Sequence, residues 1–290
     1  MPSSSLLAAV RARLSLPHVR RAVRALEGAH HSLAADRGFD FDQIAPYQPG
    51  QDVSRIDWAA TARSGEPMSR RFLTSTNAPL LVIADTGREM SALAPSGETK
   101  SAIAAEAAAI LAFLAAMRSD PFGIVFGTRT QGRYLPPRSG NAHAEVVLRT
   151  LRAAYGPDQA PSHLGAVIAH ANRMLRRPGL VVILTDIVQA GEAIEELRRL
   201  RARHRVYVLT IADRDPADLA GSDVYDAQLG PLDDTLLAHR EVTAQARAWA
   251  AGVRRRAEEG LDSLAVPHRD VASSEGLIDA FYGLFRGRSR

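Results

Sequence analysis

Four continuous runs of apolar residues dominate the hydrophobic pattern of the chain, at residues 79–85, 122–126, 180–186 and 206–212. Short apolar runs bounded by polar residues are typical of strands that are buried on both faces of a parallel sheet. Longer segments of helical periodicity lie between them, and this alternation predicts βαβ units. We therefore predict an α/β fold with a Rossmann-like, doubly wound and mostly parallel sheet.

The remaining periodic segments complete this prediction. Short strands are expected at residues 130–135, on a sheet edge, and at 264–269. Helices are expected at residues 98–118, 142–154, 164–176, 192–203, 235–263 and 274–285.

The first part of the chain has a different character. Residues 1–27 predict a basic amphipathic helix broken near Pro17. Residues 28–77 are rich in Gly, Asp, Arg and single aromatics without a long periodic run, which predicts short strands and ordered loops. We therefore expect three regions: the helical segment 1–27, an extension at 28–77, and the α/β domain at 78–290.

Composition narrows the class of protein. There are no cysteines, which excludes disulfides, thiolate metal sites and cysteine nucleophiles. The net charge is +4, Lys100 is the only lysine, and the arginine clusters mix with glutamate at helical spacing without interleaved aromatics. This pattern favours solvated helix faces over a nucleic-acid surface. The longest apolar candidate, residues 102–117, carries Glu106 and is shorter than a membrane span, and no signal peptide is apparent, so we expect a cytoplasmic protein without a membrane span.

Two of the predicted strands end in an acid, Asp85 and Asp186. Ligands of open α/β sheets bind at the carboxyl ends of strands, where the strand order reverses. Carboxylate and hydroxyl oxygens suit hard cations such as Mg²⁺. The alternative is that each aspartate caps the helix or turn that follows it.

The segment from about residue 79 to 270 resembles a von Willebrand factor A domain. Such domains carry a metal-ion-dependent adhesion site built from Asp-x-Ser-x-Ser, a threonine and a later aspartate. The sequence Asp85-Thr-Gly-Arg-Glu89 falls on the first element, Ser162 on the threonine and Asp186 on the last acid. The resemblance thus implies Mg²⁺ at Asp85, Glu89, Ser162 and Asp186.

This adhesion site is degenerate, because Gly87 and Glu89 replace both serines of the first element. Three carboxylates bound to one divalent ion would weaken the binding of a further carboxylate ligand from a partner protein. Alternatively, Arg88 or another arginine neutralises Glu89 and no metal binds. A vestigial site held by hydrogen bonds is the third interpretation.

The most distinctive segment, Gly50–Arg63, gathers charges around one large aromatic side chain: Asp52, Arg55, Asp57, Trp58 and Arg63. One interpretation is a recognition surface with Trp58 as its anchor. The other is an ion-pair network that locks the segment onto the sheet domain. On the second interpretation, we expect the four charged side chains to be substantially buried.

The same segment resembles the bacterial domain-of-unknown-function fifty-eight family. The shared motifs are Gly28-Ala-His-His-Ser32, Gly38-Phe-Asp-Phe41 leading to Tyr47, and Gly50–Arg63 with Ile56-Asp-Trp58 and Thr61-Ala-Arg63. Gln51 departs from the usual aspartate. The resemblance implies a non-enzymatic protein-interaction adaptor that acts with a MoxR-type AAA+ ATPase in protein assembly, activation or stress response.

The alternative function is a metal-dependent hydrolase that uses Asp85 and Asp186. Such an enzyme needs a nucleophile or base positioned by a third group, and the sequence offers none. We expect partner binding at the carboxyl edge of the sheet, because loops on a rigid scaffold carry function.

Overall fold

The computed structural model describes residues 5–13, 16–36, 43–47, 53, 56–71, 78–219, 225–227, 230–232 and 238–287. The chain divides into two compact units. The larger unit comprises residues 1–29 and 77–290, and the smaller comprises residues 30–76. Each unit is described by itself below.

A six-stranded sheet forms the centre of the larger unit, in the order β10-β7-β6-β3-β4-β5. Its strands are β3 (Leu80–Asp85), β4 (Phe122–Gly127), β5 (Gly132–Arg138), β6 (Leu180–Thr185), β7 (Arg205–Ile211) and β10 (His268–Val271). All neighbours are parallel except β5, which runs antiparallel to β4 at one edge. The prediction of an α/β fold with a mostly parallel sheet is therefore confirmed.

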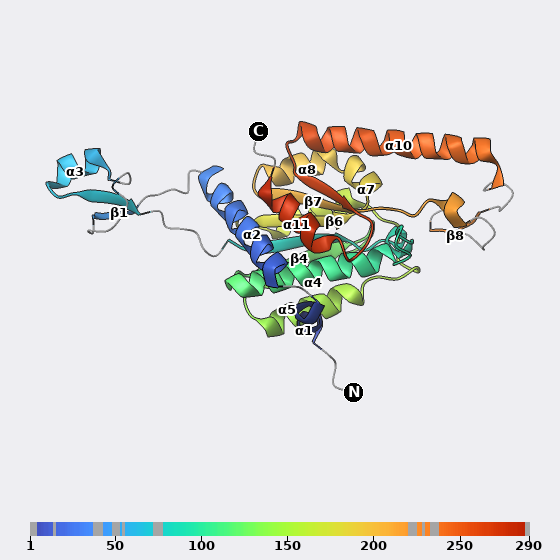
Figure 1. Cartoon of the computed structure of the whole chain (residues 1–290), viewed down its shortest axis with the longest axis horizontal. Coiled ribbons are helices and arrows are strands. Elements are labelled where there is room, and N and C mark those ends of the chain that lie inside the picture. Colours follow the sequence, from blue (N-terminus) through green and yellow to red (C-terminus); the bar gives the residue numbers. More distant parts are fainter. Residues whose placement is uncertain are drawn as a thin grey trace. The chain divides into compact units, whose positions relative to one another are not determined.

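Helices cover both faces of this sheet (Figure 1). One face is covered by α6 (Leu164–Met174), α8 (Ile194–Arg201) and the end of α10 (Arg240–Ser263), whose side chains join those of the strands in one hydrophobic core. The other face carries α4 (Lys100–Arg118), with α5 (Asn141–Arg152) and α11 (Leu277–Arg286). Because both faces are covered, β3, β4 and β6 are buried along their whole length.

Among the described residues, one helix, α4, has the length and apolar composition needed to cross a membrane. In the structure, 67% of its most apolar window is buried. The buried side chains include Ile103, Ile110 and Leu114, as expected for a core helix that contacts the strands.

The helical start of the chain consists of α1 (Leu6–Arg13) and α2 (Leu16–Asp36). Pro17 lies in the first turn of α2, where its missing N–H removes no intrahelical hydrogen bond. The helix α2 continues beyond residue 27, where we expected the helical segment to end.

The smaller unit contains a two-stranded antiparallel sheet and one short helix. The strands are β1 (Gln43–Pro46) and β2 (Met68–Arg71), and the helix is α3 (Trp58–Ser64). The short strands were expected. The helix was not, because seven residues with one turn of apolar positions give no periodic signal.

The other short elements all belong to connections. They are the 3₁₀ turns η2 (Arg88–Ser91) and η3 (Pro216–Leu219), the helix α7 (Ile187–Glu192), and the paired strands β8 (Tyr225–Asp226) and β9 (Gly230–Pro231). Among these, η2 and α7 follow directly on β3 and β6, so they shape the carboxyl edge of the sheet.

Candidate functional site

The order of the strands reverses between β3 and β6, which lie side by side in the sheet. The strand β4 follows β3 on one side, and β6 returns to pair on the other side. The carboxyl ends of β3 and β6 carry Asp85 and Asp186, and both side chains are buried. The fold therefore brings the two strand-end acids to the switch point at which α/β sheets bind ligands.

Asp85 is fully buried, at 0% exposure. Its Oδ1 accepts a hydrogen bond from the N–H of Gly87 at 2.9 Å. Burial raises the pKa of Asp85 to about 7; the neighbouring Asp186 and Glu89 add to the rise, and the hydrogen bond from the Gly87 N–H opposes it. The Oδ2 atom has no hydrogen-bond partner within the described part of the chain.

Ser162 packs directly against Gly87. A Cβ atom added at Gly87 would lie 2.3 Å from both the backbone nitrogen and the Oγ of Ser162. The backbone nitrogen of Ser162 donates to Glu89 Oε2 at 2.7 Å. Glu89 therefore holds the loop that carries Ser162, and this hydrogen bond occupies one of its carboxylate oxygens.

Both carboxylate oxygens of Asp186 are occupied. Oδ1 caps α7 by accepting from the N–H of Gln189 at 2.8 Å, which is the capping role that the sequence left open. Oδ2 accepts from Lys100 Nζ at 3.2 Å. Lys100 Nζ also pairs with Asp213 Oδ1 at 2.5 Å.

Sequence reasoning missed Lys100 and Asp213. Lys100 begins α4, and Asp213 follows β7, so the two are far apart along the chain. The backbone nitrogen of Arg214 donates to Leu93 O at 2.8 Å and brings the loop after β7 beside the loop before α4. The one available signal was that Lys100 is the only lysine in the chain.

Unpaired polar atoms also gather near Asp85. The Tyr155 hydroxyl is buried, and burial together with the charge of Asp85 raises the pKa of Tyr155. Neither this hydroxyl nor Ser162 Oγ has a hydrogen-bond partner in the described ranges. Arg88 lies in the same turn as Glu89, and its Nε is likewise buried.

These contacts do not fit a divalent ion held by three carboxylates. In the part of the chain that the structure describes, no group of three or more His, Asp or Glu side chains is arranged to hold a metal ion. Glu89 is bound to the Ser162 loop, and Asp186 is bound to Lys100 and α7. Asp85 Oδ2 and Ser162 Oγ have no hydrogen-bond partner among the residues that the structure describes.

The smaller unit holds the signature segment, in which Asp57 is half-buried and caps α3 by accepting from Ala60 N at 2.9 Å. The hydroxyl of Thr61 accepts from Met68 N at 2.9 Å and ties α3 to β2. Arg63 is exposed, so the prediction of its burial is wrong. Trp58 is 71% exposed, and Asp52 and Arg55 lie outside the described residues.

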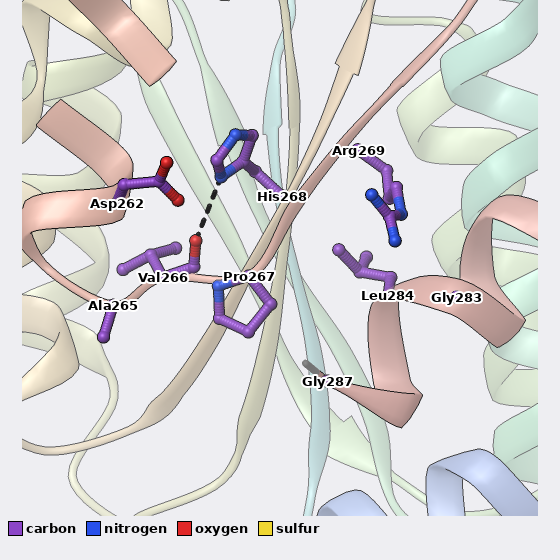
Figure 2. Close-up of a pocket in the computed structure, with 9 residues that line it drawn as sticks. All are labelled: Asp262, Ala265, Val266, Pro267, His268, Arg269, Gly283, Leu284 and Gly287. Carbon is purple, nitrogen blue, oxygen red and sulfur yellow. Dashed lines mark hydrogen bonds between the residues drawn. The ribbon is translucent and has the colours of Figure 1, made fainter. Parts of the chain in front are cut away.

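A cavity of about 540 Å³ lies elsewhere, at the amino end of β10 (Figure 2). Its titratable lining residues are Asp262, His268 and Arg269, and His268 Nδ1 lies 3.1 Å from Val266 O. The predicted site lies at the carboxyl ends of the strands. This cavity is therefore separate from it.

The chain is a member of a known protein family. The family described as "Protein of unknown function DUF58" matches residues 43–256, so the chain belongs to it. Uncharacterized proteins of Mycobacterium bovis and of Mycobacterium tuberculosis strain H37Rv are each 31% identical to it over 230 residues. The aligned region covers 77% of this chain and 70% of each relative.

Two solved structures are similar at low sequence identity. An aerotolerance-related membrane protein from Bacteroides fragilis has a TM-score of 0.43 and 13% identity, covering 72% of this chain and 98% of that protein. The pilus adhesin SpaC from Lactobacillus rhamnosus GG has a TM-score of 0.44 and 8% identity, covering 71% and 30%. At these scores the likeness carries no argument about function.

Proposed function

We propose that this chain is a non-enzymatic adaptor that binds other proteins and acts with a MoxR-type AAA+ ATPase. The observation that carries the proposal is the position of Trp58 in the smaller unit. This large aromatic side chain is 71% exposed on the first residue of a helix whose two ends are fixed. Tryptophan, with tyrosine and arginine, is enriched among the residues that contribute most to binding at protein interfaces.

The local structure supports this role because it fixes the helix that presents Trp58. Asp57 caps the start of α3, and Gly65 ends it in the left-handed conformation at φ 77°. Asp57 N donates to Met68 O at 2.8 Å, and Thr61 accepts from Met68 N at 2.9 Å. The helix that presents Trp58 is thus held at both ends, which lowers the backbone conformational entropy lost when a partner binds.

The larger unit supplies a second element of the proposal, a von Willebrand factor A-type domain with a degenerate adhesion site. The sheet order, the antiparallel edge strand and the positions of Asp85, Ser162 and Asp186 support this assignment. Because the two aspartates are buried, a partner at the carboxyl edge would contact the loops that they hold and not the carboxylates themselves.

The geometry gives less support to the alternative, a metal-dependent hydrolase. Asp85 lies close to Ser162, but His163, the residue after this serine, caps α6 by accepting from Ala166 N at 3.0 Å. Hydrolysis needs a nucleophile and a base oriented by a third group. The contacts described at this edge supply no such third group.

We also propose that the chain is cytoplasmic, with α4 as a core helix and not a membrane span, since 67% of its most apolar window is buried. Surface-plasmon measurements against the MoxR-type ATPase of the same organism, with and without ATP, test the adaptor function. We expect saturable binding in at least one nucleotide state. Absence of binding in every state would contradict the proposal, and hydrolysis of ester or phosphoester substrates would favour the alternative.

A further inference from the structure

Lys100 occupies an unusual position for a cation. It is the only lysine among 36 Lys and Arg residues, and it is 2% exposed. It is also the first residue of α4. The start of a helix carries partial positive charge, which disfavours a cation there, and burial disfavours it further. Helix stability therefore does not explain why a lysine stands at this position.

The two carboxylates that face Lys100 do explain it. Asp186 Oδ2 lies 3.2 Å and Asp213 Oδ1 lies 2.5 Å from the same nitrogen atom. Lys100 is therefore a charged ammonium group on which two carboxylates from neighbouring strand ends converge.

We propose that the Lys100 ammonium group is the resident cation of the carboxyl edge and takes the place of a bound divalent metal ion. Two carboxylate oxygens already meet at Nζ, as they would meet at a metal ion. A fixed ammonium group supplies one positive charge to this pair without any dependence on ion concentration. The loops of this edge then keep their arrangement when divalent ions are absent.

Lys100 also determines which ligands remain open to a metal. It occupies Asp186 Oδ2, while the cap of α7 occupies Asp186 Oδ1. A divalent ion at this edge would then have Asp85 Oδ2 and Ser162 Oγ as ligands, but no oxygen of Asp186. Removal of the ammonium group frees both Asp186 and Asp213, and a cation at the vacated point would have two carboxylate ligands.

The test compares Mn²⁺ binding by the full-length wild type, Lys100→Ala and Lys100→Arg. Free Mn²⁺ is measured by electron paramagnetic resonance up to millimolar concentration. We expect no depletion of free Mn²⁺ by the wild type or by Lys100→Arg, which keeps the charge. We expect Lys100→Ala to bind Mn²⁺ at least about tenfold more tightly than the wild type, because its two carboxylates are no longer neutralised.

Thermal unfolding gives a second readout, which stays informative if Lys100→Ala is less stable than the wild type. Lys100→Ala should melt at a lower temperature than the wild type, and Mn²⁺ should raise its Tm, as binding to the folded state must. The double variant Lys100→Ala/Asp186→Asn should lose this rise. Wild-type binding of Mn²⁺ that Asp85→Asn abolishes would overturn the proposal, as would a Lys100→Ala protein that neither binds Mn²⁺ nor gains Tm from it.

Discussion

Ser162 fills the space in which a side chain at residue 87 would stand, since a Cβ at Gly87 would lie 2.3 Å from Ser162 N. The φ of Gly87 is −65°, which any residue can adopt, so the requirement for glycine is steric. The adhesion-site pattern places a serine here. In this chain, Ser162 can approach residue 87 this closely because glycine has no Cβ.

Gly87→Ala should therefore destabilise the larger unit. Insertion of a methyl group into a packed site generally costs about 1–3 kcal/mol. The free energy of unfolding, measured by denaturant titration, should fall by this amount. Gly28→Ala is the matched control, because a Cβ at Gly28 meets nothing within 4 Å in helix α2.

The control should be neutral or stabilising by about 0.5–1 kcal/mol, since alanine is the better helix former. Equal stabilities for the two variants would show that Ser162 moves aside without loss. In that case the packing of Ser162 against Gly87 would not contribute to the stability of the larger unit.

The stability of the larger unit should depend on the ionisation of Asp85. Its pKa rises from 3.8 to about 7 on folding, so the folded state binds more protons than the unfolded state between these values. Stability is then fully present below the unfolded pKa and is lost as pH rises through about 7. The contribution lost between pH 5 and pH 8 is roughly 2–3 kcal/mol.

Denaturant titrations of the wild type and of Asp85→Asn at pH 5 and pH 8 isolate this contribution. Asparagine keeps an acceptor for the Gly87 N–H but carries no charge. The wild type should lose more stability than Asp85→Asn over this interval. Identical pH dependence of the two proteins would contradict the raised pKa.

The sequence predicts the core of this fold well, because buried parallel strands leave a continuous apolar signal. The strands β3, β4, β6 and β7 lie within two residues of their predicted bounds at both ends. The helices α3 and α7 were missed for a physical reason. Each is shorter than two full turns, so each gives too few positions for a 3.6-residue period to appear.

The cap of α3 gives a prediction for the smaller unit. Asp57→Ala removes the acceptor for Ala60 N and should cost about 1 kcal/mol. This is less than the loss of one partner of a buried ion pair, roughly 3–5 kcal/mol, on which the ion-pair interpretation relies. Hydrogen exchange at the Ala60 amide should become about fivefold faster.

Asp57→Asn preserves an acceptor oxygen and should retain most of the protection. If Asp57→Ala leaves exchange at Ala60 unchanged, the cap does not hold this helix. If it instead unfolds the whole unit, the ion-pair interpretation is the better one.

The candidate site is only partly readable from the sequence, because long-range partners leave no local pattern. Asp85 and Asp186 were found because each ends an apolar run. The roles of Glu89 and Lys100 could not be read, since Glu89 binds a backbone nitrogen and Lys100 binds Asp213 across two loops. The sequence left a metal ion, helix caps and a vestigial site open at these acids, and the structure adds the ammonium group of Lys100 beside Asp186.

The adaptor function is tested most directly by the two tryptophans of the chain, which are both exposed. Trp58 is 71% exposed in the smaller unit, and Trp249 is 68% exposed on α10. Surface-plasmon binding to the MoxR-type ATPase should be compared for the wild type, Trp58→Ala and Trp249→Ala. We expect Trp58→Ala to weaken binding by at least about thirtyfold, equivalent to about 2 kcal/mol, and Trp249→Ala to bind like the wild type. Unchanged binding by a folded Trp58→Ala protein would contradict it.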